Sequence, residues 1–280
     1  MARNVHVYDA LRPGIEADLA AMKILPSRER DFDAAADKLV RLYMRSAYGD
    51  VPQTTGIPLP WIAASFDREA SSDFSRSPAQ GDPWDRVSVR VPKGRGPFRS
   101  WSEAAKDAYH LNGLDRVGAA NWTWALGYYY AELFNGFGYR DWHHMRSPYV
   151  IGGTNLQTRG KYTRDGRFDS SVMDQQLGVV PLMMRMVERC PALTFPGAWP
   201  FPEPLALVQS PPTVPAPTPL AAFDIKAIQR ALNAKGFGPL AVDGSFGRKT
   251  SAALREFESD HGLDADGLLD RQTVDALLAD

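Results

Sequence analysis

A proline-rich stretch late in the chain places the strongest constraint on how this sequence can fold. Nine of the 24 residues from Pro196 to Pro219 are proline. Proline fixes φ and lacks a backbone donor, so this stretch cannot form a regular helix or a central strand. It is typical of an extended spacer, and a proline-rich ligand for a recognition domain is the alternative. We therefore expect two folded parts, residues 1–195 and 221–280, joined by a linker over 196–220.

Composition and charge exclude several classes of protein. The chain has 280 residues, of which 44% are hydrophobic and 23% charged, as in ordinary folded proteins. Its formal net charge of −1 gives no global electrostatic attraction to nucleic acid or an anionic membrane. The single cysteine, Cys190, excludes an intramolecular disulfide. No apolar run is long enough for a signal peptide or a membrane span, so we expect synthesis in the cytoplasm, no membrane insertion, and a monomer.

The last 60 residues predict three short helices. Ile225, Ile228 and Leu232 recur at helical spacing, and Asp224 stands where an N-cap is expected. Two further helices are expected, one after residue 249 and one over 273–278.

An internal repeat links these helices. Residues 242–250 and 265–273 each contain an Asp-Gly turn, followed by a threonine seven residues after the aspartate. We expect these threonines, Thr250 and Thr273, to be helix N-caps. The region resembles the peptidoglycan-binding domain type 1 family, a three-helix module that anchors proteins to the cell wall. The resemblance implies peptidoglycan as partner, although Glu258 and Asp270 stand where the family often has Gln and Gly. The matching positions are 228–229, 232–233, 238–240, 242–244, 246–247, 250, 257, 262–263 and 266–267.

Residues 1–195 predict a mostly helical domain. Alternating valines over 86–91 predict one short strand inside it. The expected helices cover 14–23, 31–47, 59–70, 102–112, 121–134 and 171–190.

Glu69 is the candidate for acid catalysis. It comes late on the apolar helix 59–70, among Trp61, Ile62 and Phe66. Burial of a carboxyl group raises its pKa toward the value that a general acid needs. By position alone, a Glu near a helix end is more often a surface or capping residue, so position does not identify Glu69 as the acid.

The residues around Glu69 resemble the glutamate-bearing helix and loop of bacterial and phage lysozyme-like proteins. The resemblance spans about residues 58–190, and residues 134–136 also resemble a segment of goose-type lysozymes and soluble lytic transglycosylases. It implies a mainly α, lysozyme-like catalytic domain with a small β element. It also implies that Glu69 protonates the glycosidic oxygen between N-acetylmuramic acid and N-acetylglucosamine. This sequence departs from related ones at Asp67, where His or Asn is expected. The motifs lie at 65–76, 81–83, 132–140, 147–150, 153–162 and 165–168.

Glycoside hydrolysis often needs a second carboxylate, which stays ionised near the cationic transition state. Asp82 is our candidate for positioning or polarising water, because its Gly-Asp-Pro sequence fixes a turn. Asp73 and Asp85 are alternatives, and capping of the turn is an equal possibility for all three. Some lysozyme-like enzymes work with one glutamate.

Aromatic residues are dense between 122 and 149, and most are expected in the core. Tyr139 and Tyr149 flank turns and are the candidates for a saccharide groove. The resemblance implies that Asn135, Asn155 and Tyr162 donate or accept hydrogen bonds with N-acetyl groups.

No cofactor is expected from the sequence. The adjacent His143 and His144 can rarely both bind one metal ion, and no third ligand is suitably spaced.

These features predict a modular peptidoglycan hydrolase, an endolysin-like muramidase that acts on the bacterial cell wall. Two alternatives remain. A lytic transglycosylase would give 1,6-anhydro products, and a non-catalytic protein would serve in wall binding or as a phage structural component.

Overall fold

The computed structural model describes residues 7–79, 81–89, 93–164, 167–190, 192–196, 224–244, 248–263 and 271–279. The expected linker, 196–220, lies outside these ranges except for Pro196. Two separate hydrophobic cores are formed, one by residues between Ile15 and Phe195 and one by residues between Ile228 and Leu277. No helix in the described ranges is long and apolar enough to cross a membrane.

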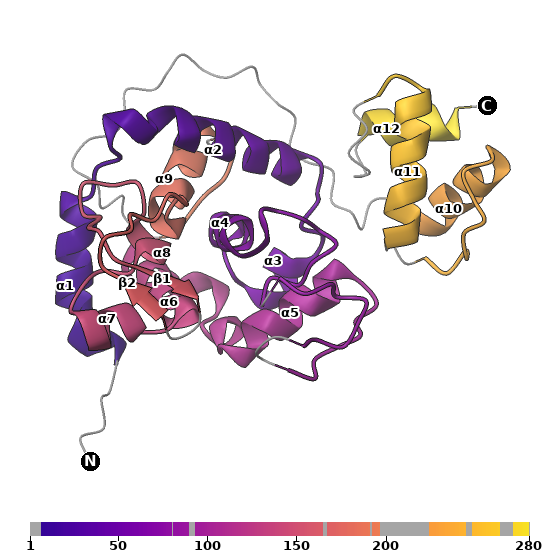
Figure 1. Cartoon of the computed structure of the whole chain (residues 1–280). Coiled ribbons are helices and arrows are strands. Elements are labelled where there is room, and N and C mark those ends of the chain that lie inside the picture. Colours follow the sequence, from indigo (N-terminus) through magenta and orange to yellow (C-terminus); the bar gives the residue numbers. More distant parts are fainter. Residues whose placement is uncertain are drawn as a thin grey trace.

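The larger part is mainly helical and has a small two-stranded sheet (Figure 1). The strands pair antiparallel, with Tyr162 opposite Phe168. The main elements are α1 (Tyr8–Ala21), α2 (Glu29–Met44), α3 (Val51–Thr55), α4 (Leu59–Ala70), α5 (Trp101–Leu111), α6 (Trp124–Asn135), α7 (Gly138–His143), α8 (Pro148–Ile151), β1 (Lys161–Arg164), β2 (Arg167–Asp169) and α9 (Val179–Arg189).

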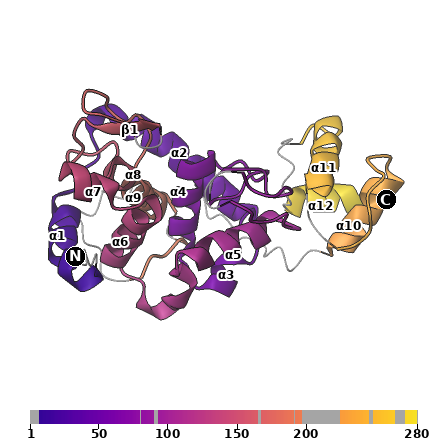
Figure 2. The ribbon, with the colours of Figure 1, turned by 60° about the horizontal axis from the view of Figure 1, so that its bottom comes forward.

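Helix α4 runs through the middle of this part, where Figure 1 shows it end-on and Figure 2 shows it between α2 and α5. Pro60 lies in its first turn, where the missing N–H costs nothing. Trp61 and Phe66 are fully buried, and the Trp61 indole Nε1 donates to the Gly127 carbonyl of α6 at 3.0 Å. This apolar surround fixes the C-terminal end of α4, which carries Glu69.

Six expected helices correspond to α1, α2, α4, α5, α6 and α9. The bounds of α4 agree with the expected 59–70, whereas α9 begins at Val179, not at 171. The short helices α3, α7 and α8 were not expected, because each is too brief to show a helical period.

The expected strand over 86–91 is wrong for its described residues, 86–89. Val87 and Val89 are 54% and 74% exposed, so the alternation does not cover a core. The segment turns back on itself: the Ser88 N–H donates to the Arg95 carbonyl at 2.8 Å. Among the residues that the structure describes, no strand pairs with 86–89 and no core covers these valines, so alternation alone does not produce a strand. The sheet forms later in the chain, at β1 and β2.

The smaller part consists of α10 (Ile225–Ala234), α11 (Arg248–Asp260) and α12 (Arg271–Leu278). The N-cap at Asp224 is confirmed, since its carboxylate accepts the Ala227 N–H at 3.1 Å. The N-caps expected at Thr250 and Thr273 are wrong. Both residues are buried at the third position of their helices, within the first turn, where side chains from preceding helices contact them. Gln229 donates to the Thr250 hydroxyl, and Thr273 donates to Glu258, each at 3.3 Å.

Two buried or half-buried amides on α10 hold the turn that follows it. Gln229 donates to Asp243 at 2.9 Å and accepts the Gly244 N–H at 2.9 Å. Asn233 donates to the Leu240 carbonyl at 2.9 Å and accepts the Leu240 N–H at 2.7 Å. These positions of the family pattern therefore serve turn formation.

Candidate active site

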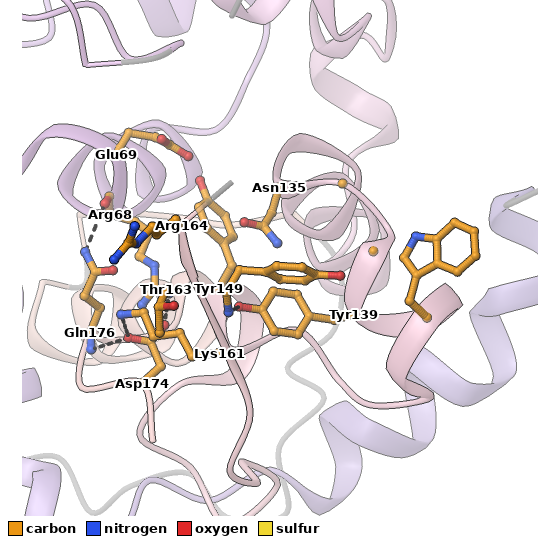
Figure 3. A pocket seen from close by; sticks show the side chains of 14 residues that line it. Arg68, Glu69, Asn135, Tyr139, Tyr149, Lys161, Thr163, Arg164, Asp174 and Gln176 are labelled. Carbon is orange, nitrogen blue, oxygen red and sulfur yellow. Dashed lines mark hydrogen bonds and ion pairs between the residues drawn. The ribbon is translucent and has the colours of Figure 1, made fainter. Parts of the chain in front are cut away.

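A cleft of about 560 Å³ opens beside the C-terminal end of α4 (Figure 3). It is bounded by the ends of α4 and α6, by α7, α8 and β1, and by the segment before α9. Its lining residues are Arg68, Glu69, Asn135, Gly136, Gly138, Tyr139, Trp142, Tyr149, Lys161, Tyr162, Thr163, Arg164, Asp174 and Gln176.

Glu69 lies at the penultimate position of α4 and is partly buried at one end of this cleft. Desolvation by burial raises the pKa of Glu69 from 4.5 to about 7. The Tyr149 hydroxyl, which points toward the Glu69 carboxyl in Figure 3, and the positive charge of Arg68 both lower that pKa, but only in part. The negative end of the helix dipole also disfavours an anion here. Glu69 is therefore able to hold and release a proton near neutral pH.

Asp174 is the other carboxylate that lines the cleft, and it is engaged by two cations. Its Oδ2 pairs with Arg68 Nη2 at 2.5 Å and its Oδ1 with Lys161 Nζ at 2.8 Å. Asp174 is 1% exposed, and although burial opposes ionisation, the charge of Arg68 and the hydrogen bonds from Lys161 and the Gln176 N–H lower its pKa. Asp174 is thus an ionised group whose two oxygens bind Arg68 and Lys161.

Four of the predicted substrate-binding residues line the cleft with Glu69: Asn135, Tyr139, Tyr149 and Tyr162. Asn135 donates to the Ser147 hydroxyl at 3.0 Å, which orients its amide. The Tyr139 hydroxyl accepts the Tyr162 N–H at 3.1 Å, so it ties α7 to β1. Tyr139 and Tyr149 are buried, and their rings form walls of the cleft more than free stacking surfaces.

Two other predicted site residues are not in the cleft. The buried Asp82 carboxylate accepts the Val89 N–H at 3.0 Å and so holds the loop of residues 82–89. Asn155 accepts the Lys23 N–H at 2.7 Å and donates to the Ala21 carbonyl at 3.0 Å. Asn155 therefore fastens the end of α1 to the segment after α8.

The alternatives to Asp82 do not line the cleft either. Asp73 accepts the Ser75 N–H at 2.9 Å and pairs with Arg76 at 3.1 Å, as a turn-capping residue does. Asp85 lies 4.0 Å from the Arg86 guanidinium. Asp67, the departure from related sequences, bonds with Lys38 and with the Ser72 hydroxyl.

Four further residues of the cleft, Arg68, Lys161, Asp174 and Trp142, lie outside the predicted site. The position of Arg68 next to Glu69 in the sequence is a signal that could have pointed to it. Asp174 lies 106 positions from Arg68, and no local pattern connects the two.

His143, one of the two adjacent histidines, contacts aromatic residues of the sheet. The His143 ring stacks on Phe168 with 3.5 Å between centroids, and His143 Nε2 lies 2.9 Å from the Tyr162 hydroxyl. In the part of the chain that the structure describes, no group of three His, Cys, Asp or Glu residues is placed to hold a metal ion.

Comparison with known proteins adds information on the smaller part. Residues 223–277 match the family model described as a putative peptidoglycan binding domain. No curated protein and no solved structure matches the chain significantly. The chain therefore carries a peptidoglycan-binding module, which indicates association with the cell wall.

Proposed function

We propose that the chain is a peptidoglycan glycosidase of the muramidase type. The observation that carries this proposal is Glu69, a carboxyl group with a pKa of about 7 at one end of an open cleft. The peptidoglycan-binding module supports it by supplying the substrate class. In this proposal residues 1–195 cut the wall, residues 196–220 are a spacer and residues 221–280 hold the wall.

In the proposed reaction the Glu69 carboxyl protonates the oxygen between N-acetylmuramic acid and N-acetylglucosamine. The bond between the anomeric carbon and this oxygen breaks, and a cationic sugar forms. Water then adds to the anomeric carbon and its proton returns to Glu69. Asp174 is not proposed as the second carboxylate, because Arg68 and Lys161 occupy both of its oxygens. The mechanism therefore relies on one glutamate.

The test is lysis of outer-membrane-permeabilised cells by the wild type and by Glu69→Gln. Glutamine keeps the shape of the side chain and removes its transferable proton, so the rate should fall about 10²- to 10⁴-fold. Glu29→Gln is the matched control, since Glu29 is exposed at the start of α2. Equal lysis by wild type and Glu69→Gln contradicts the assignment of the acid.

Mass spectrometry of the released fragments distinguishes the two enzyme classes. Reducing ends support the muramidase, and 1,6-anhydro ends indicate a transglycosylase, in which the 6-hydroxyl of muramic acid replaces water. Absence of lysis by the wild type on every wall tested favours a non-catalytic wall-binding protein.

A further inference from the structure

Trp142 is a large apolar side chain that stands open to solvent in the cleft. It is 77% exposed and is among the residues that line the cleft with Glu69. A single exposed hydrophobic residue is ordinary on a protein surface. What distinguishes Trp142 is its position: among the residues that the structure describes, the other tryptophans, Trp61, Trp84, Trp101, Trp122 and Trp124, are all buried.

The helix that carries Trp142 is held firmly on both sides of it. Arg140 forms two hydrogen bonds with the buried Glu132 of α6, at 2.9 and 2.7 Å. On the next position after Trp142, the His143 ring stacks on Phe168 of β2. These contacts therefore hold the backbone at Trp142 in place, while its indole ring stays exposed to solvent.

A small residue keeps the space beside the indole free. A Cβ atom on Gly138 would lie 3.7 Å from Trp142 Cδ1 and 3.5 Å from the Tyr162 hydroxyl. A side chain at this position would therefore occupy the space that adjoins both groups. With glycine at position 138, the Trp142 ring and the Tyr162 hydroxyl lie next to backbone that carries no side chain. An apolar face next to hydrogen-bonding groups suits a pyranose, whose ring hydrogens form an apolar face and whose hydroxyls lie at the edge.

We propose that Trp142 is a stacking platform for a sugar ring of the glycan strand. It would bind a ring away from the bond that Glu69 cleaves. This inference rests on the proposed function of the same cleft. Because the platform is already in place before binding, little conformational entropy is lost when the sugar arrives. Trp142 thus acts in substrate affinity and in preference for longer glycans, and takes no part in proton transfer.

The test measures binding in the full chain with Glu69→Gln, which prevents cleavage. The probes are peptide-free glycans of four and six alternating N-acetylglucosamine and N-acetylmuramic acid residues. Trp142→Ala should raise the Kd for the six-sugar glycan about three- to tenfold, as expected for loss of one aromatic contact. Trp142→Phe should restore part of the affinity. Leu111→Ala, which removes an exposed apolar residue at the end of α5, should leave the Kd unchanged.

Tryptophan fluorescence gives a direct readout. Residues 221–280 contain no tryptophan, so the signal comes only from the rest of the chain. Saccharide should change the tryptophan emission of the Glu69→Gln variant, and this change should disappear when Trp142→Phe is added.

An unchanged Kd in Trp142→Ala, or a loss of affinity seen only with peptide-bearing glycans, overturns the inference. Suppose that Glu69→Gln abolishes lysis but Trp142→Ala, added to it, leaves saccharide binding normal. Then the stacking role of Trp142 is wrong, and the proposed function stands. If the wild type neither lyses walls nor binds saccharide, the proposed function is wrong as well.

Discussion

At the scale of single residues, the solvation and the partners of two carboxyl groups in the cleft set their pKa values. Burial desolvates Glu69, and the Tyr149 hydroxyl and the charge of Arg68 offset this only in part, so the pKa of Glu69 rises to about 7. Burial opposes ionisation of Asp174 as well, yet its pKa is lowered because Arg68 and Lys161 contact it directly. Burial alone therefore does not determine the protonation state; the partner inside the buried site does.

The pKa of Glu69 predicts how activity depends on pH. A general acid must be protonated, and Glu69 is protonated below its pKa, so kcat/KM should fall as pH rises through about 7. Tyr149→Phe removes a hydroxyl that lowers the pKa of Glu69, so the alkaline limb should move to higher pH. Initial rates between pH 5 and 9 on a soluble glycan measure both effects. A limb that moves to lower pH in Tyr149→Phe contradicts this account.

At the scale of elements, an ion cluster joins the end of α4 to β1 and to the segment before α9. Arg68 of α4 bonds Asp174 and the Leu177 carbonyl, and Lys161 of β1 bonds Asp174 from the other side. Because α4 carries Glu69 and β1 forms one wall of the cleft, this cluster keeps the two sides of the site together. Its residues come from three separate regions of the chain.

Asp174→Asn should reduce the free energy of unfolding of the larger part by about 3 kcal/mol, since the mostly buried Arg68 and the partly exposed Lys161 lose a buried counter-ion. Urea titration followed by tryptophan fluorescence measures it, because residues 221–280 contain no tryptophan. Asp73→Asn is the matched control: its pair with Arg76 is half-exposed, so the loss should stay below about 1 kcal/mol. Equal losses of unfolding free energy in the two variants would show that the Asp174 cluster stabilises the fold no more than an exposed ion pair does.

Elements differed in how well the sequence predicted them. Helix α4 was predicted to its bounds because its proline start and its apolar run are local signals. The predicted strand is wrong for residues 86–89, because among the described residues no strand pairs with them, a condition set by distant residues. Glu69 was the candidate acid because its apolar helix and the loop after it resemble those of lysozyme-like proteins, whereas Asp174 and Trp142 acquired their positions only through packing of α7, β1 and α4.

At the scale of the whole molecule, the proposal combines a cleft with a wall-binding module in one chain. Tethering raises the local concentration of the substrate around the cleft. The benefit should depend on the substrate being part of the wall, since a soluble glycan is not held by an anchored module.

Removal of residues 221–280 should therefore lower the initial rate on insoluble peptidoglycan sacculi about tenfold or more. The rate on a soluble six-sugar glycan should change little. Release of soluble reducing ends measures both rates, with full-length Glu69→Gln as the blank. An equal loss on both substrates would indicate that the missing residues support the fold of the rest of the chain.

By itself, the sequence determined the mainly helical class, the two-part organisation that we propose and the three-helix form of the smaller part. All of these depend on local spacing, on turn residues or on the conformational limits of proline. Tertiary structure alone decided which polar groups meet in the cleft, that Asp82 and Asn155 lie outside it, and that Trp142 stays exposed. The physical reason is that burial and pairing of a side chain depend on residues far away in the chain, whose approach is fixed only when the core packs.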